Sequence, residues 1–414
     1  MNNVGVFCFY FPSRGVSGVP VLFSRIALAL SRRASVKKVY VVDFVDGYIA
    51  ESIKGQSKIE LIPFNFGKSV YIPDDVTFIT QAMLPYRFPS ELVIPATSKI
   101  VFWNLHPDNL VPVLIPFPGL RNIQFSSFNL YEKIGKMFFK RTIGQVKTFA
   151  SICLQKNALL FMDSVNRNKT AQYLFLDILN NDFLPVPALN SDKRINHKDN
   201  SDLTFCWVGR LCDFKIHILL YTIDRLTIIS KELKIKIKYK IIGDGPFRFE
   251  IDKLDLNNEF FELEMLGAVS SEKLDDILIN EVDILTAMGT SALEGAKFAL
   301  PTIVLDFSYA KIVDNYKYRW LYNTEDFDLG HNISSKDFDR DGNSLKQIIL
   351  ESFHNYSDIS NKTLDYFLDN HSIDGVVEKL ILATEESNLK ITDFPKSIFK
   401  KSLIRNLYEV FKKK

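Results

Sequence analysis

Residues 204–215 read TFCWVGRLCDFK, an apolar run that ends in a glycine and continues into a more polar loop. A second apolar run, Ile237–Ile242, ends in the glycine turn Gly243-Asp-Gly-Pro246. Residues 216–233 separate the two runs and carry apolar side chains at the spacing of an amphipathic helix. Two short strands joined by a helix favour a parallel pair, because such a pair needs a long crossover connection. This stretch therefore predicts an α/β domain.

The same alternation extends through the rest of the chain. In the second half it predicts further strands at Phe260–Leu266, Asp283–Ala287 and Thr302–Leu305. In the first half it predicts strands at Val4–Phe11, Val39–Phe44, Ile59–Ile62, Val76–Ile79 and Ile100–Leu105. Residues 190–202 interrupt the pattern with a single apolar side chain, which is typical of a linker. We therefore predict an α/β chain with two doubly wound Rossmann-like domains, residues 1–189 and 203–370, facing a cleft, and C-terminal helices with a basic tail at 371–414.

The composition narrows the class of protein. A length of 414 residues corresponds to two or three domains, and 47% hydrophobic with 24% charged residues excludes a largely disordered chain. The net charge of +2 provides no chain-wide positive field for a nucleic acid. The four cysteines lack the spacing of a zinc site, so we expect a reducing compartment with neither disulfide nor metal. Because the sequence shows no secretion signal and no apolar run of about eighteen residues, we expect a cytoplasmic protein.

Two cations follow the glycine that ends the first quoted strand. Arg210 comes directly after Gly209, and Lys215 lies five residues further, on a strand-to-helix turn. A guanidinium fork and an ammonium group in this arrangement can converge on one diphosphate. The alternative is that both are solvated surface side chains, which is the usual environment of Arg and Lys.

Two later glycine turns could also approach an anion. Gly243 permits a sharp turn with positive φ, although a plain connection between strand and helix is the alternative. Gly289, Thr290 and Ser291 precede a predicted helix, whose N-terminus attracts negative charge. Ser291 and Glu294 also fit the spacing of a capping box, a structural role that can coexist with anion binding.

In this order the three segments resemble the retaining glycosyltransferases of the GT-B fold, in particular family 4 and its relatives. The matching residues are Gly209-Arg210-Leu211 with Lys215, Gly243-Asp244-Gly245-Pro246, and Glu294 before Leu300-Pro301. The resemblance implies transfer of a sugar from a nucleotide-diphosphate donor to a carbohydrate or lipid-linked acceptor. It places the acceptor side in residues 1–189 and the nucleotide sugar in residues 203–370, and it implies no cofactor besides the donor substrate and no metal.

The resemblance also assigns roles to individual residues. The catalytic residues would be His106, Arg210 and Lys215, and the donor-binding residues Gly18, Gly209, Gly243, Gly289, Thr290, Ser291 and Glu294. In the first domain, Ser17-Gly18 stands at the place of a Gly-Gly loop, and His106 follows a strand where relatives have a donor-site histidine. A structural or surface histidine is the alternative for His106. Thr286 stands where the family has a first glutamate, so nucleotide binding carries over better than the sugar chemistry does.

Two basic segments suggest a surface that contacts an anionic membrane. Residues 395–414 contain seven Lys or Arg and one Glu, and residues 131–152 contain five and one. Apolar residues recur beside these cations at helical spacing, and basic amphipathic helices bind anionic lipid surfaces. The sequence is thus compatible with a peripheral location on the inner face of the cell membrane. The alternative is that the last helix crosses back and packs on the first domain.

These observations leave three functions open. The favoured one is a glycosyltransferase of bacterial surface polysaccharide assembly. A non-catalytic nucleotide-sugar-binding subunit agrees with Thr286, and a nucleotide-sugar epimerase would share the fold. Residues 337–342 (DFDRDG) resemble the start of a calcium loop, but Ile348 stands where the bidentate glutamate belongs, so we expect a surface turn there.

Overall fold

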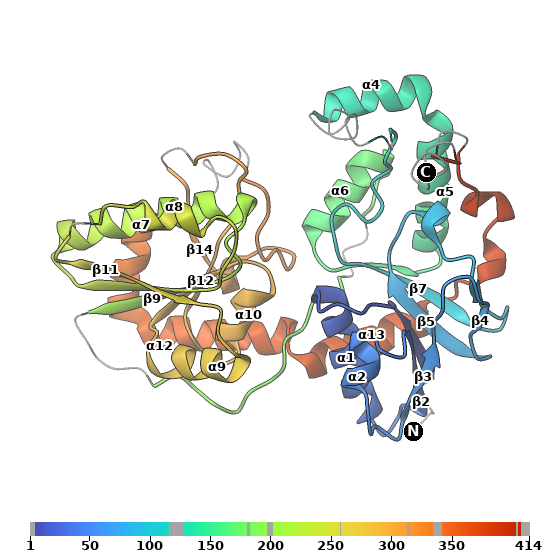
Figure 1. The fold of residues 1–414 in the computed structure, drawn as a ribbon, viewed down its shortest axis with the longest axis horizontal. Coiled ribbons are helices and arrows are strands. Elements are labelled where there is room, and N and C mark those ends of the chain that lie inside the picture. The colour runs from blue at the N-terminus through green and yellow to red at the C-terminus, as the bar shows by residue number, and fades with distance from the viewer. Residues whose placement is uncertain are drawn as a thin grey trace. The chain divides into compact units, whose positions relative to one another are not determined.

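The computed structural model describes residues 5–115, 117, 127–179, 183–196, 202–256, 258–312, 315–333, 342–402 and 405–406. The chain forms two compact units, each built on its own β-sheet (Figure 1). Unit 1 comprises Met1–Pro185 and Val376–Lys414, and unit 2 comprises Val186–Gly375. The predicted α/β class with two doubly wound domains is confirmed. Among the described residues, no helix has the length and apolar character that spanning a bilayer requires.

The sheet of unit 1 has the strand order β3-β2-β1-β5-β7-β8, and all of its strand pairs are parallel. Its strands are β1 (Val6–Tyr10), β2 (Lys38–Asp43), β3 (Ile59–Pro63), β5 (Val76–Gln81), β7 (Lys99–Asn104) and β8 (Leu159–Phe161). Phe7, Cys8 and Phe9 of β1 are at most 1% exposed, as expected for a parallel sheet covered on both faces. β4 (Val70–Tyr71) and β6 (Leu92–Val93) form a separate two-stranded sheet.

Helices connect these strands in the manner of a Rossmann-like domain. The helical segments are α1 (Gly18–Ser31), α2 (Tyr48–Ser52), η1 (Pro85–Arg87), α4 (Phe128–Phe138), α5 (Lys140–Gln155) and α6 (Ser164–Leu174). Ser127 caps α4 by accepting a hydrogen bond from the Leu130 N–H at 3.1 Å. Phe139, with φ −125° and ψ 23°, separates α4 from α5. The segment 131–152, which the sequence pattern treats as one amphipathic stretch, therefore contains two helices that meet at a corner.

The C-terminal part of the chain returns to unit 1 through α13 (Ile373–Glu386), η4 (Ile391–Asp393) and η5 (Lys396–Phe399). The Ile100 N–H donates to the Leu389 carbonyl at 2.8 Å, and Phe394 and Ile398 are buried in the unit 1 core. The alternative in which the C-terminal helix returns to the first domain is thus confirmed for the described residues. Residues 403–404 and 407–414 of the basic tail lie outside the described residues.

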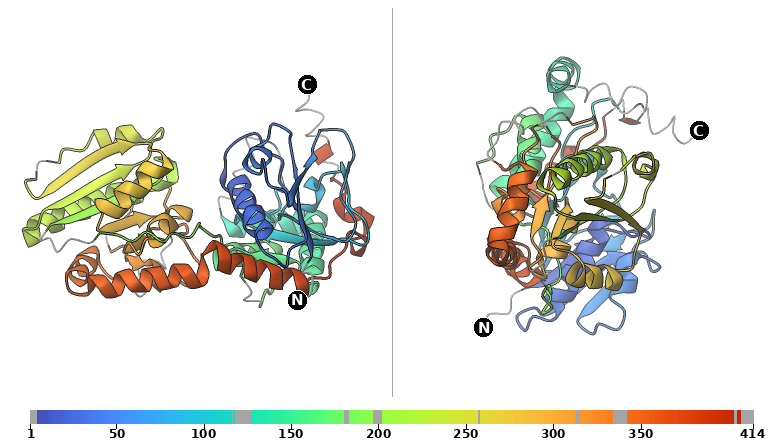
Figure 2. Two further views of the ribbon diagram at one scale, coloured as in Figure 1. Left: turned by 90° about the horizontal axis from the view of Figure 1, so that it is seen from below. Right: turned by 90° about the vertical axis from the view of Figure 1, so that its left-hand side faces the viewer.

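The sheet of unit 2 has the order β11-β10-β9-β12-β13-β14, with only the pair β13–β14 antiparallel. Its strands are β9 (Leu203–Val208), β10 (Ile237–Ile242), β11 (Phe261–Gly267), β12 (Ile284–Ala287), β13 (Thr302–Val304) and β14 (Arg319–Trp320). Its helical segments are α7 (Asp213–Leu233), α8 (Arg248–Asp252), α9 (Ser271–Asn280), α10 (Thr290–Ala296), η3 (Leu321–Asn323) and α12 (Leu345–Asn370). The helices lie on both faces of this sheet (Figure 2).

The segment predicted as a linker, 190–202, is described at 190–196 and 202. Its backbone is bonded to unit 2, because Ile195 N–H donates to the Phe298 carbonyl at 3.1 Å and Asn196 N–H to the Ile279 carbonyl at 3.0 Å. Together with the bridge between Ala188 and Ser372, these bonds attach the segment to unit 2.

Candidate functional site

The strand order of the unit 2 sheet reverses between β9 and β12. In open α/β sheets, ligands bind beyond the carboxyl ends of the strands at this point. The chain leaves β9 at Gly209 and leaves β12 at Met288-Gly289. The sequence-predicted residues Gly209, Arg210 and Gly289 therefore lie on the two loops where the topology predicts a ligand.

The loop after β9 packs backbone to backbone on the turn after β10. Gly209 N–H donates to the Ile242 carbonyl at 3.0 Å, and Leu211 N–H to the Asp244 carbonyl at 3.1 Å. A Cβ atom on Gly243 would overlap the Gly209 carbonyl oxygen, and one on Gly245 would overlap that of Leu211. The glycine turn after β10 is therefore required for loop packing, so the structural alternative accounts for Gly243. The same packing holds the Arg210 backbone in place.

Arg210 and Lys215 lie on either side of the start of α7. Arg210 is exposed, and Lys215 is partly buried in the first turn of the helix. Among the described residues, neither side chain has a hydrogen bond or a carboxylate partner, and Lys215 Nζ lies 5.9 Å from the centroid of the Phe214 ring. Burial lowers the pKa of Lys215, because its ammonium loses hydration, and the neighbouring Cys212 offsets this shift only in part. The loop thus presents two cations at the switch point with their charge uncompensated by the described residues.

The start of α10 differs from the sequence expectation. The N-cap of α10 is Gly289, whose φ of 62° and ψ of −149° are readily accessible only to glycine, and no side chain caps the helix. The predicted capping box of Ser291 and Glu294 is therefore wrong, because the glycine turn starts the helix at Thr290 and leaves Ser291 inside it. Gly289 N–H donates to the Leu329 carbonyl at 2.6 Å, which ties this turn to a loop that sequence reasoning had not considered.

Glu294 and Thr286 have contrasting environments. Glu294 Oε2 accepts a hydrogen bond from Lys297 Nζ at 2.7 Å, and Lys297 also pairs with Asp275 at 3.0 Å. Thr286 is fully buried in β12, where its hydroxyl contacts the Tyr239 hydroxyl at 2.7 Å and donates to the Cys206 carbonyl at 3.0 Å. Thr286, at the place where the resembling family has its first glutamate, is therefore held inside the sheet and does not face solvent.

A buried ionic cluster supports the loop that binds Gly289. Arg319 donates to both carboxylate oxygens of Asp306, at 2.7 and 2.8 Å, and to Asp328 at 3.1 Å. His331 Nδ1 lies 2.5 Å from Asp328, whose other oxygen accepts the Gly330 N–H at 2.8 Å. Asp306, Asp328 and His331 could ligate a metal by their spacing, but the guanidinium already occupies the place of a cation between the two carboxylates. The calcium-like segment 337–342 lies outside the described residues except for Gly342.

Aromatic side chains beside Lys215 form a second feature that the sequence did not reveal. Phe214 contacts the rings of Phe307 and Tyr309, with centroids 5.3 and 6.0 Å apart, and Tyr309 is 64% exposed. Phe307 and Tyr309 follow β13 at alternate positions, and this pattern is the sequence feature from which the aromatic surface could have been predicted. They place a flat apolar surface next to the uncompensated cations.

In unit 1, Gly18 begins α1 after the loop that follows β1, and β1 adjoins β5 at the switch point of this sheet. The loop is shaped by Asp43, a fully buried residue at the end of β2. Its carboxylate accepts the N–H groups of Ser13, Phe44, Ile49 and Ala50 at 2.7–3.1 Å. Asp43 is an acidic residue at the end of an otherwise apolar strand, and this pattern could have predicted its structural role from the sequence.

His106 lies two residues after β7 and is exposed. Its Nδ1 accepts a hydrogen bond from the Asp108 N–H at 3.1 Å, so the proton of the neutral ring is on Nε2. This geometry places His106 at the carboxyl edge of the unit 1 sheet with one ring nitrogen available to a ligand.

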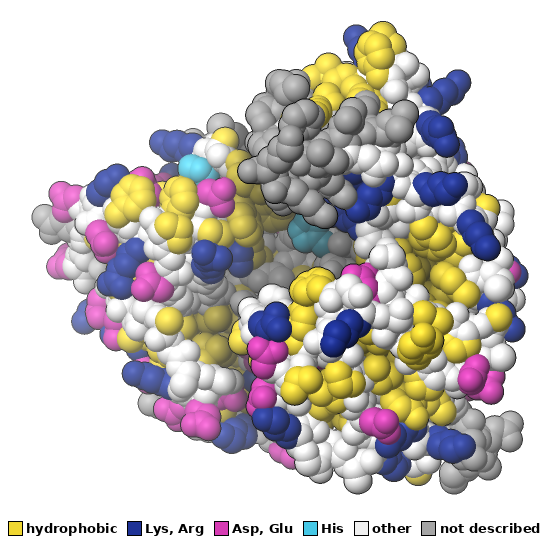
Figure 3. Space-filling view, turned by 45° about the vertical axis from the view of Figure 1, so that its right-hand side comes forward, with side chains coloured by type: hydrophobic (Ala, Val, Ile, Leu, Met, Phe, Trp, Pro, Cys, Tyr) yellow, Lys and Arg dark blue, Asp and Glu magenta, His cyan; other side chains and the backbone are white. Residues whose placement is uncertain are grey.

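The corner between α4 and α5 exposes apolar residues among cations. Met137 and Phe138 are 70% and 72% exposed, whereas Ile143 and Phe149 of the same predicted segment are core residues. Lys133, Lys136, Lys140 and Arg141 are exposed around this corner. Figure 3 shows hydrophobic and basic side chains together at the top of unit 1, where α4 lies.

Comparisons with known proteins relate this architecture to solved structures. No family model matches the sequence, and no curated protein matches it. A glycosyltransferase from Rickettsia africae ESF-5 is 12% identical and covers 93% of this chain and 99% of its own, with a TM-score of 0.52. Apo OtsA is 11% identical with a TM-score of 0.52, covering 92% of this chain and 98% of its own. The N-terminal domain of trehalose-6-phosphate phosphatase from Candida albicans is 11% identical with a TM-score of 0.51, covering 93% and 97%.

These likenesses extend over nearly the full length of each compared chain, and both sheets of this chain have the strand order of a doubly wound domain. The chain has the GT-B fold of two Rossmann-like domains.

Proposed function

We propose that the chain is a glycosyltransferase that moves a sugar from a nucleotide-diphosphate donor to a carbohydrate or lipid-linked acceptor. We further propose retention of anomeric configuration, independence of a metal, and a role in bacterial surface polysaccharide assembly. The fold supports this proposal, since one solved structure with the same fold is a glycosyltransferase. The fold alone hosts other activities, so the argument rests on the site.

The observation that carries the proposal is the pair Arg210 and Lys215 at the switch point of unit 2. Their charge has no partner among the described residues, and the pKa of Lys215 is lowered by burial. A bound diphosphate would supply the missing negative charge, and the N-terminus of the long helix α7 would add its positive dipole. As the sugar bond breaks, negative charge grows on the leaving diphosphate, so the same cations stabilise the transition state.

The remaining predicted residues take supporting roles. The backbone at Gly209 and from Gly289 to Ser291 would approach the phosphates. Glu294 would accept hydrogen bonds from ribose hydroxyls while Lys297 holds its carboxylate in place. The exposed Tyr309 would offer a surface to the base.

Unit 1 would contribute to the sugar and acceptor. His106 Nε2 can donate a hydrogen bond to a sugar oxygen, because Nδ1 is engaged by Asp108. Gly18, at the start of α1, would let a ligand approach the helix N-terminus closely. Retention would follow if the acceptor attacks the donor sugar from the same face that the departing phosphate leaves, with that phosphate assisting the attack.

The buried Thr286 keeps a second function open. Since the position of the family's first glutamate is turned into the sheet, a non-catalytic nucleotide-sugar-binding subunit would have the same nucleotide site. An epimerase of the same fold would also bind the donor but would need no acceptor. The three functions differ in their products, so they can be separated by chemistry.

We also propose peripheral attachment to an anionic membrane surface through the α4–α5 corner. Met137 and Phe138 would insert between headgroups while the surrounding Lys and Arg meet lipid phosphates. This location would bring unit 1 to a lipid-linked acceptor.

The experiment combines a thermal-shift screen of nucleotide-diphosphate sugars with an assay of the stabilising donor. A ligand at a hundred times its Kd should add about 2.7 kcal/mol to the free energy of unfolding. Acceptor-dependent release of the nucleoside diphosphate supports transfer, release of a stereoisomeric donor supports epimerisation, and stabilisation without either supports the binding subunit. Lys215→Ala should lower turnover by roughly a hundredfold or more.

Lys236→Ala is the matched control. Lys236 is exposed at the amino end of β10, on the opposite edge of the same sheet. It removes the same charge from unit 2 without touching the switch point. If the Lys215 and Lys236 variants transfer sugar at the same near-normal rate, the assignment of the diphosphate site is wrong.

A further inference from the structure

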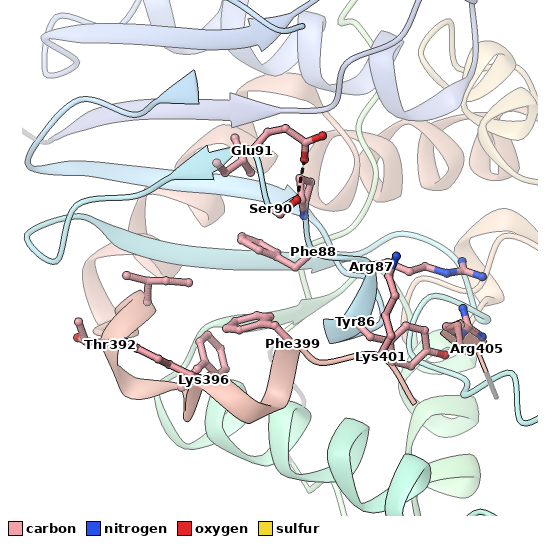
Figure 4. Close-up of a pocket in the computed structure, with 14 residues that line it drawn as sticks. Tyr86, Arg87, Phe88, Ser90, Glu91, Thr392, Lys396, Phe399, Lys401 and Arg405 are labelled. Atoms are coloured by element: carbon pink, nitrogen blue, oxygen red, sulfur yellow. Dashed lines mark hydrogen bonds between the residues drawn. The ribbon is translucent and has the colours of Figure 1, made fainter. Parts of the chain in front are cut away.

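A groove of about 1260 Å³ lies in unit 1 between two segments that are far apart in the sequence (Figure 4). One wall is formed by residues 86–92, which follow β5, and the other by seven described residues near the C-terminus, namely Ile391, Thr392, Phe394, Lys396, Phe399, Lys401 and Arg405. We name this cavity the C-terminal groove. Gln145 of α5 supports the second wall by donating to the Lys400 carbonyl at 2.8 Å. All lining residues belong to unit 1, whereas the proposed diphosphate site belongs to unit 2.

One end of the groove gathers hydrogen-bond donors around Tyr86. Tyr86 is 3% exposed, and its hydroxyl has no hydrogen-bond partner among the described residues. The Arg405 guanidinium lies over its ring at 4.2 Å and donates to the Val113 carbonyl at 3.3 Å. Burial raises the pKa of Tyr86, although Arg405, Arg87 and the nearby Val113 backbone oppose the shift, so the phenol remains an O–H donor at neutral pH. Figure 4 shows Arg87, Lys401 and Arg405 at this same end.

The middle of the groove is apolar. The ring centroids of Phe88 and Phe399 lie 5.4 Å apart, and those of Phe394 and Phe399 lie 5.5 Å apart. Leu92 and Ile391 continue this wall. The groove therefore joins a cluster of donors to a surface that favours hydrocarbon.

The charge of the lining specifies the sign of an occupant. Four of the fourteen lining residues are Lys or Arg, and one, Glu91, is acidic. Glu91 lies away from Tyr86 and accepts hydrogen bonds from the Ser90 hydroxyl and the Gly67 N–H, both at 3.4 Å. A phosphodiester offers negative charge and several acceptor oxygens, which match a phenol O–H, guanidinium groups and an ammonium group.

We infer that the C-terminal groove binds the phosphate headgroup of an anionic lipid, with the donors around Tyr86 on the phosphate and the first part of the acyl chains against Phe88 and Phe399. This inference deepens the proposed membrane attachment by naming a headgroup site, and it depends neither on sugar transfer nor on the apolar corner at α4–α5. It assigns a specific ligand to Lys401 and Arg405, two described cations of the basic C-terminal segment.

The experiment measures binding of the full-length protein to vesicles of phosphatidylcholine alone and of phosphatidylcholine mixed with phosphatidylglycerol. Tyr86→Phe keeps the ring and the net charge but removes the hydroxyl. It should weaken binding to the anionic vesicles roughly fivefold, by the loss of one hydrogen bond. The melting temperature without lipid should change little, because the Tyr86 hydroxyl has no hydrogen-bond partner among the described residues and only the Val113 backbone near it.

A pair of charge variants tests the cations. Arg87→Gln/Lys401→Gln should weaken binding to anionic vesicles by about thirtyfold, at about fivefold for each cation near the surface. The matched control is Lys37→Gln/Lys68→Gln, which removes the same charge from exposed sites in unit 1 outside the groove. The control should lose much less affinity than the groove pair.

Three outcomes would overturn the inference. If the two charge pairs lose equal affinity for anionic vesicles, or if Tyr86→Phe has no effect, binding depends only on the overall charge of the protein. Glycerol phosphate that binds as tightly as the anionic vesicles would mean that the groove serves a soluble phosphate compound. Phe138→Ser separates the corner from the groove, since it should weaken binding to both kinds of vesicle, whereas Tyr86→Phe should affect only the anionic ones.

Discussion

Lys215→Met should affect stability and ligand binding in opposite directions. Methionine keeps an unbranched apolar stem in the first turn of α7 and removes the charge. In the folded protein the pKa of Lys215 is lowered by burial. A cation with a lower pKa in the folded state destabilises the fold wherever it is charged in both states, and this penalty disappears as pH rises toward the unfolded pKa. At neutral pH the unliganded variant should therefore be at least as stable as the wild type.

Binding of the nucleoside diphosphate should become weaker in the same variant. Lys215 has no carboxylate partner among the described residues, so its charge is available to a phosphate. A hydrogen bond to a charged group contributes about 1.5–3 kcal/mol, which corresponds to a roughly 10- to 150-fold increase in Kd. The stability advantage of the variant should shrink as pH rises into the alkaline range, because the wild-type ammonium then loses its proton.

The assay is thermal unfolding with and without nucleoside diphosphate, combined with calorimetric titration and repeated at several pH values. Lys236→Met, at the opposite edge of the sheet, should leave the Kd unchanged. An unchanged Kd in Lys215→Met would refute the diphosphate assignment. A large loss of stability in the absence of ligand would refute the argument that Lys215 is a buried charge without compensation.

Three further predictions concern the same unit. Glu294→Gln should raise the Kd for the nucleotide about tenfold or more with little change in melting temperature, whereas an unchanged Kd with a lower melting temperature would mean that Glu294 serves only its ion pair with Lys297. Gly245→Ala should lower the free energy of unfolding by more than about 2 kcal/mol in denaturant titrations, because the new Cβ meets the Leu211 carbonyl, and a neutral effect would contradict the backbone packing. Arg319→Met should lower the free energy of unfolding by about 3–5 kcal/mol in denaturant titrations, because it leaves Asp306 buried beside Asp328 without a cation. An unchanged free energy of unfolding would contradict the role of Arg319 as the counter-charge of this cluster.

The position of the proposed diphosphate site could be predicted because its parts are local. Gly209, Arg210 and Lys215 lie within seven residues, directly after a strand that its own apolar run identifies. In a doubly wound sheet such a residue must lie at the carboxyl edge, so its approximate place follows from the secondary structure. The predicted capping box of Ser291 and Glu294 was wrong for an equally local reason. The backbone conformation of Gly289 decides where α10 begins, and the spacing of residues in the sequence does not reveal that conformation.

The sequence alone predicted the two-domain α/β class, ten of the strands and the cations after β9, but it missed the short strands β4, β6, β8 and β14. These features depend on hydrophobic periodicity and on residues next to one another in the chain. Only the tertiary structure decided which distant groups meet. It brought Arg319 to Asp306 and Asp328 and buried Thr286 in β12. It also brought Phe399, Lys401 and Arg405 to the segment around Tyr86. Such contacts depend on how helices and strands pack against one another. The pattern of residues along the chain does not show which distant residue a buried side chain will contact.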